Sequence, residues 1–249
     1  MGEAWPSPGS GCDMAKLKRI LLKLSGEMLA GTAGFGVDAA TLSALTADLS
    51  AAVAQGVEIG VVIGGGNFFR GIKASESGIR RVTVDHMGML ATVINALALA
   101  DYLNVNGTSA RVMSAIPMGS VAEPFDREKA NEYLRQGSVV IFAAGTGSPY
   151  FTTDTAASLR AIEIEADLLA KATKVDGVYD KDPAVHPDAK RYEKISYDQV
   201  LADGLGVMDA AAVALCRDNN MPVLVFNLGV PGSIGRVISG ESPGTLMTV

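Results

Sequence analysis

Histidine and cysteine are scarce in this chain, which has two of each among its 249 residues. Cys12 and Cys216 lie far apart in the sequence, so no disulfide framework is expected, and such low cysteine usage is typical of a reducing compartment. His86 falls in a helical pattern and His186 in a proline-flanked loop, and two histidines placed in this way do not predict a metal site. We therefore expect a cytoplasmic protein whose chemistry depends neither on disulfides nor on a metal held by its own side chains.

The chain also lacks an excess of positive charge. Its formal net charge is −6, which argues against a nucleic-acid partner because such surfaces are usually basic. An anionic substrate must then be attracted by local cations and backbone dipoles. We find no apolar run of membrane-spanning length and expect no membrane partner. The first 13 residues are rich in Gly, Pro and Ser and lack the features of a signal peptide. We expect residues 1–15 to be a disordered extension and residues 16–249 to form a single domain.

Apolar runs alternate with amphipathic stretches along the rest of the sequence. The apolar runs predict strands at residues 20–24, 57–63, 111–114, 139–144, 168–172 and 223–227. Helical spacing predicts helices at residues 38–54, 84–103, 127–135, 155–166 and 207–218, the first of them capped by Asp38. This alternation predicts an α/β fold, a three-layer αβα sandwich around a mainly parallel sheet. Ligands bind beyond the carboxyl ends of the strands in such sheets, so the residues that follow each strand are the first candidates for a site.

Two of these strand ends combine glycines with a cation. The run Gly64–Gly66 follows a buried strand and precedes Arg70, which favours a phosphate cradle, although a tight turn with a surface arginine explains it as well. Lys23 lies inside the first strand and is followed by Ser25 and Gly26. A cation beside flexible backbone donors suits the β- and γ-phosphates of a nucleotide, and the alternative is an edge lysine that extends to solvent. The order of these residues is not that of a P-loop.

The most specific segment is Gly145–Thr155, which follows a buried strand and opens a helix. Its hydroxyls, its glycines and the helix N-terminus favour an anion site, and Tyr150 and Phe151 are suited to wall a planar base. Asp154 either caps the helix or orients the lysine and glycine donors around a transferring phosphoryl group. Asp85 opens the predicted helix at residues 84–103, where an N-cap is the favoured interpretation and a contact with ribose hydroxyls is the alternative. That helix is nearly all apolar, which suits either the core or a subunit interface.

A further polar segment, Lys171–Pro183, follows the strand predicted at residues 168–172. It carries hydroxyl, aromatic and carboxylate side chains that are suited to bind adenine and ribose. A solvated, charged hairpin explains the local pattern equally well.

Taken together, these segments resemble the bacterial uridylate (UMP) kinases, which belong to the amino acid kinase superfamily. The resemblance runs from about Ile20 to Val249 and rests on the strings LLKLSGE, GFGVD, GVVIGGGNFFRG, VDHMGMLATVINALAL, MSAIPMG, AGTGSPYFTTDTAA, IEIEADLLAKATKVDGVYDKDP and the terminal GTL. It implies an ATP-dependent kinase that phosphorylates UMP to UDP in pyrimidine nucleotide biosynthesis. It also implies a homohexamer that is activated by GTP and inhibited by UTP, and Mg²⁺ that arrives with ATP.

The resemblance also implies roles for particular residues. It places ATP against Lys23, Leu24, Ser25, Gly26, Gly66, Arg70, Thr173, Tyr179 and Asp182. It places UMP against Gly65, Asp85, Thr146, Gly147, Ser148, Pro149, Tyr150, Phe151, Thr152 and Thr153. The response to GTP is expected at the turn formed by Gly31, Thr32, Ala33, Gly34, Phe35 and Gly36, whose simpler interpretation is a glycine-rich connection.

The expected chemistry agrees with these placements. The α-phosphate of UMP is largely deprotonated near neutral pH, since its second pKa is about 6, and needs no general base. We expect Lys23, the N–H groups of Gly65 and Gly66, and Arg70 to neutralise the transferring phosphoryl group, with Asp154 holding Lys23 in place. Two alternatives remain open: a related kinase that phosphorylates a carboxylate or carbamate, and a relative without catalytic activity that binds anions.

Overall fold

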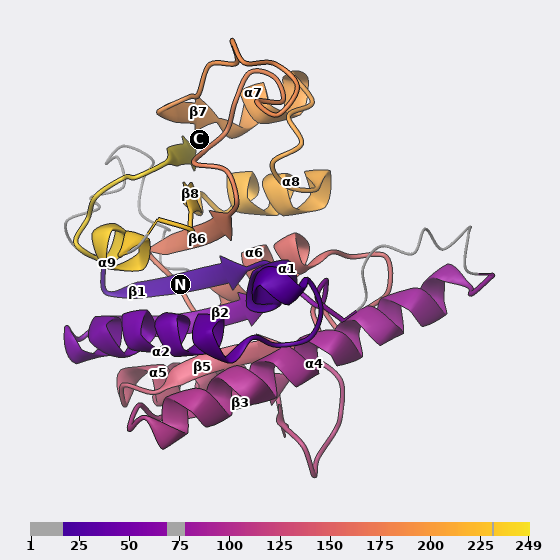
Figure 1. The fold of residues 1–249 in the computed structure, drawn as a ribbon, viewed down its shortest axis with the longest axis vertical. Helices are drawn as coiled ribbons and strands as arrows, with labels where there is room; N and C mark the ends of the chain where they lie inside the picture. The colour runs from indigo at the N-terminus through magenta and orange to yellow at the C-terminus, as the bar shows by residue number, and fades with distance from the viewer. Residues whose placement is uncertain (1–16, 69–77, 231) are drawn as a thin grey trace, which may run out of the picture.

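The computed structural model of the protein describes residues 17–68, 78–230 and 232–249, and a nine-stranded sheet runs through them (Figure 1). The strand order is β4-β3-β5-β2-β1-β6-β8-β9-β7. Only β8 and β9 pair antiparallel, and the other neighbours in this sheet run parallel. The strands are β1 (Arg19–Leu24), β2 (Glu58–Ile63), β3 (Ala110–Ser114), β4 (Glu123–Pro124), β5 (Val139–Ala143), β6 (Leu168–Thr173), β7 (Lys194–Ser196), β8 (Val223–Asn227) and β9 (Thr245–Thr248).

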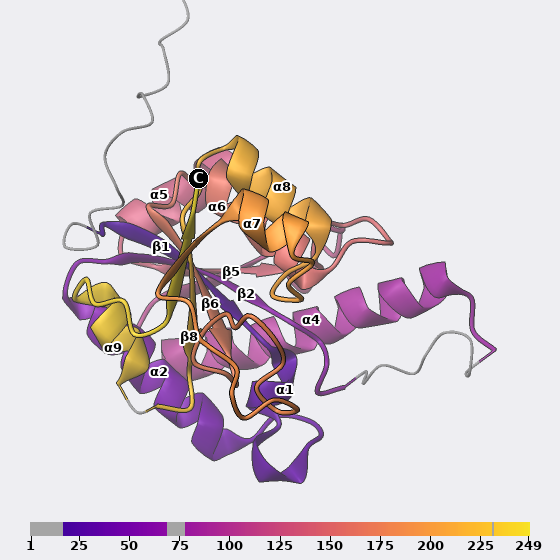
Figure 2. The same ribbon diagram turned by 90° about the horizontal axis from the view of Figure 1, so that it is seen from above.

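Helices cover both faces of this sheet, as the view from above shows (Figure 2). One face carries α1 (Gly26–Leu29), α2 (Ala39–Ala54), α4 (Arg81–Val105) and α9 (Ser233–Ile238). The other carries α5 (Arg127–Arg135), α6 (Thr153–Glu163), α7 (Tyr197–Ala202) and α8 (Ala210–Asp218). Alternate residues of β1 serve the two cores, since Ile20 and Leu22 pack against the first set of helices and Leu21 against the second. The expected three-layer α/β sandwich around a mainly parallel sheet is confirmed.

The predicted strands and helices occur within a few residues of their expected positions. Asp38 caps α2 as expected, because its side chain accepts a hydrogen bond of 2.8 Å from the backbone N–H of Thr41. The long helix α4 begins at Arg81, three residues before the expected start, and α8 begins at Ala210, three residues after it. Short elements such as α1, α7 and α9 were not predicted, because four to six residues hold too few turns to show a helical period.

Helix α4 corrects the expectation that no apolar run reaches membrane-spanning length. By length and composition alone its 25 residues could cross a membrane. Its residues Val93, Ala96, Leu99 and Leu103, however, lie in the core between the sheet and α2. A core helix passes the same test of length and composition, so this observation is weak evidence for a membrane span.

Two predictions about the exposure of single residues are confirmed, and other predictions fall on residues that the structure does not describe. Cys216 is buried, as expected, and His186 is exposed, as expected. Cys12, Arg70 and the expected boundary at residue 16 lie outside the described residues, so the extension and the single-domain organisation stay predictions.

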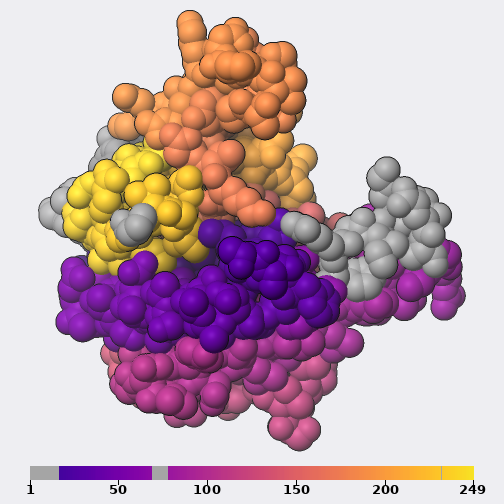
Figure 3. Space-filling model, in the orientation of Figure 1, coloured from indigo at the N-terminus to yellow at the C-terminus, as the bar shows by residue number. Residues whose placement is uncertain are grey.

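In the space-filling view the loop-rich segment that leads to β7 and α7 (orange) projects beyond the rest of the molecule (Figure 3).

Candidate active site

The carboxyl ends of β1 and β6 bring two lysines together. Lys23 of β1 and Lys171 of β6 are register partners in neighbouring parallel strands, so their side chains leave the sheet on the same face. Asp154, in the first turn of α6, lies between them. Its Oδ1 is 2.8 Å from Nζ of Lys23, and its Oδ2 accepts a hydrogen bond of 2.6 Å from Nζ of Lys171. We call Lys23, Asp154 and Lys171 the triad.

The triad is largely shielded from water. The three side chains are between 11% and 15% exposed. Burial alone would raise the pKa of Asp154, but the two adjacent ammonium groups outweigh burial and lower that pKa, so the carboxylate stays ionised. Burial lowers the pKa of Lys171 below its ordinary value, against the attraction of Asp154. Two cations thus share one anion, which leaves the triad with one positive charge.

The start of α6 is fixed by hydroxyl groups, and this decides between the two alternatives for Asp154. Thr152 is the N-cap, since its side-chain oxygen accepts hydrogen bonds from the backbone N–H groups of Asp154 (3.0 Å) and Thr155 (3.4 Å). Asp209, which caps α8 through Ala212 N–H, accepts hydrogen bonds from the hydroxyls of Thr152 and Thr155. Asp154 therefore does not cap the helix, and its carboxylate is free to pair with the lysines.

The glycine run after β2 lies against two other parts of the chain. A Cβ atom on Gly26 would lie 2.2 Å from the carbonyl oxygen of Gly64, so the backbones after β1 and β2 are in direct contact. A Cβ atom on Gly65 would lie 2.7 Å from Cβ of Ala91 in α4. Both positions therefore need glycine for packing. The backbone of the glycine run owes its position to this close approach.

A buried pair of amide side chains secures the same loop. Asn67 and Asn95 are almost fully buried and exchange two hydrogen bonds, of 2.8 and 2.7 Å. Asn95 also donates to the carbonyl oxygen of Gly64 (2.7 Å), and Asn67 donates to that of Gly36 (2.7 Å). The pair thus ties the glycine run, α4 and the turn at residues 31–36 to one another. Buried amides satisfied in this way hold a single backbone geometry.

A cavity of about 290 Å³, which we call the helix pocket, lies beside the glycine run along α4. Residues from three segments line it: Gly65 and Gly66; Arg81, Val84, Asp85, Gly88, Met89 and Thr92 of α4; and Gly145, Thr146, Ser148, Phe151, Thr152 and Thr153. Gly147, Pro149 and Tyr150 belong to the same segment without lining the cavity. Most residues expected at UMP therefore meet around one cavity.

Asp85 is not the N-cap of α4, which corrects the favoured interpretation. The helix begins four residues earlier, and Arg80 takes the N-cap position. The carboxylate of Asp85 pairs instead with Arg81 at 2.8 Å and accepts a hydrogen bond of 2.8 Å from the backbone N–H of Tyr150. Tyr150 has a φ of 73°, in the left-handed region that residues other than glycine rarely adopt. Asp85 thus holds this strained residue at the edge of the helix pocket.

A second cavity, of about 630 Å³, lies beyond the carboxyl end of β6, and we call it the β6 pocket. Lys171, Thr173, Tyr179 and Asp182 line it. Tyr179 also forms an isolated antiparallel bridge with Arg191, so the expected hairpin-like character of this segment and its cavity coexist. The triad lies close to both cavities along the chain, because Lys171 lines the β6 pocket and Thr153, the residue before Asp154, lines the helix pocket.

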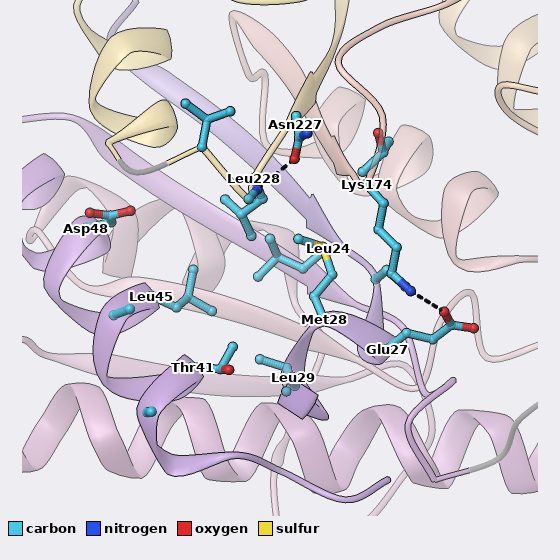
Figure 4. Close-up of a pocket in the computed structure, with 17 residues that line it drawn as sticks. Leu24, Glu27, Met28, Leu29, Thr41, Leu45, Asp48, Lys174, Asn227 and Leu228 are labelled. Carbon is cyan, nitrogen blue, oxygen red and sulfur yellow. Dashed lines mark hydrogen bonds and ion pairs between the residues drawn. The ribbon is translucent and has the colours of Figure 1, made fainter. Parts of the chain in front are cut away.

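A third cavity, of about 770 Å³, lies between α1, α2 and the end of β8, and Leu24, Ser25 and Thr173, which were expected at ATP, line it (Figure 4). Its walls are mainly apolar, with Leu24, Met28 and Leu45 among them, and the ion pair of Lys174 with Glu27 (3.0 Å) lies at one side. No residue of the triad lines it. The expected regulatory turn touches this cavity only through Gly31.

Comparison with known proteins agrees with this arrangement. The profile of the amino acid kinase family matches residues 18–227. The chain belongs to the amino acid kinase family. It is 56% identical to a protein named "Uridylate kinase" from Legionella pneumophila (strain Lens), over 93% of this chain and 94% of that protein. A protein of the same name from Aliivibrio fischeri is also 56% identical, over 93% of this chain and 95% of its own length.

Solved structures of this family show the same architecture. The UMP kinase from Bacillus anthracis superposes with a TM-score of 0.90 at 42% identity, covering 93% of this chain and 96% of that one. The UMP kinase from Ureaplasma parvum gives a TM-score of 0.88 at 36% identity, covering 94% and 100%. The chain therefore matches these amino acid kinases over nearly its whole length.

Sequence reasoning missed several residues of this amino acid kinase site. Lys171 lies inside an apolar strand, the same signal that singled out Lys23, yet it was taken only as the start of a polar segment. Asn95 carries no local signal, because its partners are 28 to 31 residues away, and Asp209 shows in the sequence only as a possible N-cap of α8, since its partners in α6 are 54 to 57 residues away. Only the folded chain brings them to the site.

Proposed function

We propose that this protein transfers the γ-phosphate of ATP to UMP, giving ADP and UDP, as a step of pyrimidine nucleotide biosynthesis. The observation that carries the proposal is the triad at the carboxyl edge of the sheet, where Lys171 lines the β6 pocket and Thr153, next to Asp154, lines the helix pocket. Two proteins named uridylate kinase, each 56% identical over nearly the whole chain, support UMP as the acceptor.

In this proposal each cavity holds one nucleotide. UMP occupies the helix pocket, with its phosphate at Gly65 and its ribose near Asp85. ATP occupies the β6 pocket, with its base near Tyr179 and Asp182, and its phosphates extend past Thr173 to Ser25, Gly26 and Gly66. The two phosphate ends then meet near the triad, where phosphoryl transfer requires the attacking and leaving oxygens to lie roughly in line.

The chemistry follows from the charges at the triad. An α-phosphate oxygen of UMP attacks the γ-phosphorus of ATP, and the bond to the β-phosphate oxygen breaks. The attacking oxygen is already deprotonated near neutral pH, so no side chain has to accept a proton. The ammonium group of Lys23 and the N–H groups of the glycine run neutralise charge on the transferring group. Asp154 orients Lys23 through their ion pair. Arg70 is proposed to clamp phosphate oxygens.

Mg²⁺ is proposed to arrive with ATP. Among residues 17–68, 78–230 and 232–249 no group of three or more His, Cys, Asp or Glu side chains is placed to hold a metal ion. Asp154, the carboxylate nearest the proposed reaction, is already engaged by two lysines. Mg²⁺ favours phosphate oxygens and water over an all-protein cage, and it supplies charge neutralisation on the nucleotide. The donors around the triad fit a metal that the nucleotide carries.

We further propose that the protein is a cytoplasmic homohexamer whose activity GTP raises and UTP lowers. Leu90, Ile94 and Leu97 form an exposed apolar stripe on α4, with 47%, 48% and 37% of each residue accessible. Their spacing puts them on one face of the helix, and a stripe of this kind suits a subunit contact. The expected GTP-responsive turn contacts the glycine run through Gly36 and Asn67, which gives an effector at the turn a route to the site.

The decisive experiment measures ADP release from ATP with UMP, CMP, glutamate or aspartate as the acceptor. We expect release with UMP, and release with an amino acid in place of UMP would favour the alternative kinase. Lys23→Met should lower turnover with UMP by a factor of about 100 or more while the circular dichroism spectrum stays unchanged. Lys18→Met is the matched control, because Lys18 is exposed and precedes the opposite end of β1. Saturable binding of both nucleotides without UDP formation would contradict the proposal.

A further inference from the structure

Helix α4 has a glycine in its interior that its own geometry does not explain. Gly88 lies in the second turn of a 25-residue helix, seven residues from the start. Glycine inside a helix is destabilising relative to alanine, because it loses more backbone freedom on folding. Gly88 is not among the residues with positive φ, so a helical alanine fits the backbone at this position.

Close packing does not explain Gly88 either. The glycine run does approach α4 here, and a Cβ atom on Gly65 would lie 2.8 Å from the carbonyl oxygen of Gly88. That contact requires a glycine at position 65, not at position 88. A Cβ atom built on Gly88 finds no heavy atom of the described chain within 4 Å, apart from its own helix backbone and chain neighbours. The space in front of Gly88 therefore belongs to no described neighbour.

That space is the helix pocket, because Gly88 is one of the residues that line it. Along α4, Gly88 lies one turn after Asp85 and one turn before Ala91, which packs against Gly65. Positions three residues apart share a face of a helix. Gly88 thus lies between the residue proposed for the ribose and the residue proposed for the phosphate.

We propose that Gly88 is a specificity-determining residue for the phosphoryl acceptor. The missing side chain leaves room for the sugar–phosphate junction of UMP, which passes over the helix backbone at this point. A methyl group here occupies space that the ligand needs, so the helix gives up stability to keep the pocket open. This inference rests on the proposed placement of UMP in the helix pocket.

The test is Gly88→Ala beside the matched control Gly235→Ala. Gly235 is an exposed glycine inside α9, and a Cβ atom there also meets no heavy atom within 4 Å. Both substitutions should raise Tm, by about 2–4 °C, because alanine is more favourable than glycine inside a helix. Only Gly88→Ala should raise KM for UMP, by about tenfold, and weaken UMP binding measured without ATP. KM for ATP should not change in either variant.

The outcomes separate this inference from the proposed placement of UMP. An unchanged KM for UMP in Gly88→Ala, with KM raised in Asp85→Asn, would overturn the role of Gly88 and leave the placement intact. An unchanged KM for UMP in both Gly88→Ala and Asp85→Asn would overturn both the role of Gly88 and the placement of UMP in the helix pocket. Gly88→Ala that sediments as a smaller species, with KM raised for ATP as well as UMP, would assign the space to a subunit contact and would also overturn the inference.

Discussion

Replacing Asp154 with asparagine isolates the electrostatic role of the triad. The substitution keeps the shape of the side chain and removes the one negative charge that two buried lysines share. Removing one partner of a buried ion pair costs about 3–5 kcal/mol, and the 11–15% residual exposure of these side chains favours the lower end, about 3 kcal/mol. That is a large part of the stability of a typical domain, about 5–15 kcal/mol.

A double-mutant cycle with Lys171→Met separates this cost from general damage to the fold. The single Lys171→Met variant keeps the pair of Asp154 with Lys23 and loses the hydrogen bond that Lys171 donates to the carbonyl of Val207. The double variant removes one charge of each sign, so it should be more stable than the sum of the two single effects by about 1 kcal/mol or more. Turnover should stay low in both variants that lack Asp154, because Lys23 is no longer held. Urea unfolding and ADP release measure the two quantities. Stability effects that add within about 0.5 kcal/mol would refute the shared-charge argument.

The pH dependence of the same variant provides a second check on this argument. The pKa of Asp154 is lowered in the folded protein, so its stabilising contribution is present above the ordinary carboxyl pKa of about 3.9 and is lost as the pH falls through the lower folded value. The difference in unfolding free energy between the wild type and Asp154→Asn should therefore stay constant from pH 8 to pH 5. This difference should shrink towards pH 10. Burial already lowers the pKa of Lys171, and when Lys171 loses its proton in Asp154→Asn the variant no longer carries that unpaired buried charge. A difference in unfolding free energy between the wild type and Asp154→Asn that grows towards alkaline pH would contradict this reasoning.

Three further predictions test other parts of the site. Asp85→Asn should raise KM for UMP more than KM for ATP without loss of helix content in circular dichroism, because α4 begins at Arg81. Asn95→Leu should lower the free energy of unfolding by about 2–4 kcal/mol, measured in urea, because the buried amide of Asn67 loses both hydrogen bonds to Asn95 and the carbonyl of Gly64 loses its Asn95 donor; an unchanged midpoint would show that the amide pair is dispensable. Ile94→Glu should reduce the assembly size in light scattering, whereas Val105→Glu, at the exposed end of the same helix, should not.

The sequence predicted the framework well because the framework depends on local pattern. Buried parallel strands such as β2 and β5 are continuous apolar runs, and amphipathic helices such as α2 show their period over four turns. The start of α4 was misplaced for a physical reason. Its N-cap residue, Arg80, makes no side-chain capping bond, so Asp85, a conventional cap residue next to the apolar run, was favoured in error.

The candidate site was only partly predictable, because its contacts join distant segments. The contact of Lys23 with Asp154 was expected from chemistry and resemblance, and it is present at 2.8 Å. The second lysine on the same carboxylate was not expected, since nothing in the sequence says that β1 and β6 are neighbours while, in the described part of the chain, four strands and five α-helices separate them. The catalytic role of these residues stays a prediction until turnover is measured.

The net positive charge of the triad gives a reason why two lysines share one carboxylate at this site. The whole chain carries a net charge of −6, so its overall field repels ATP and UMP. Inside the site, Lys23 and Lys171 both pair with the carboxylate of Asp154, Asp209 is a further negative charge that acts on Lys171, and the three paired side chains are shielded from water. A transferring phosphoryl group supplies the negative charge that the triad lacks, at the position where low exposure makes the attraction strong. We therefore expect the positive charge of the triad to serve the transition state at a cost in stability, and a further carboxylate introduced beside Lys23 should stabilise the fold and slow the reaction.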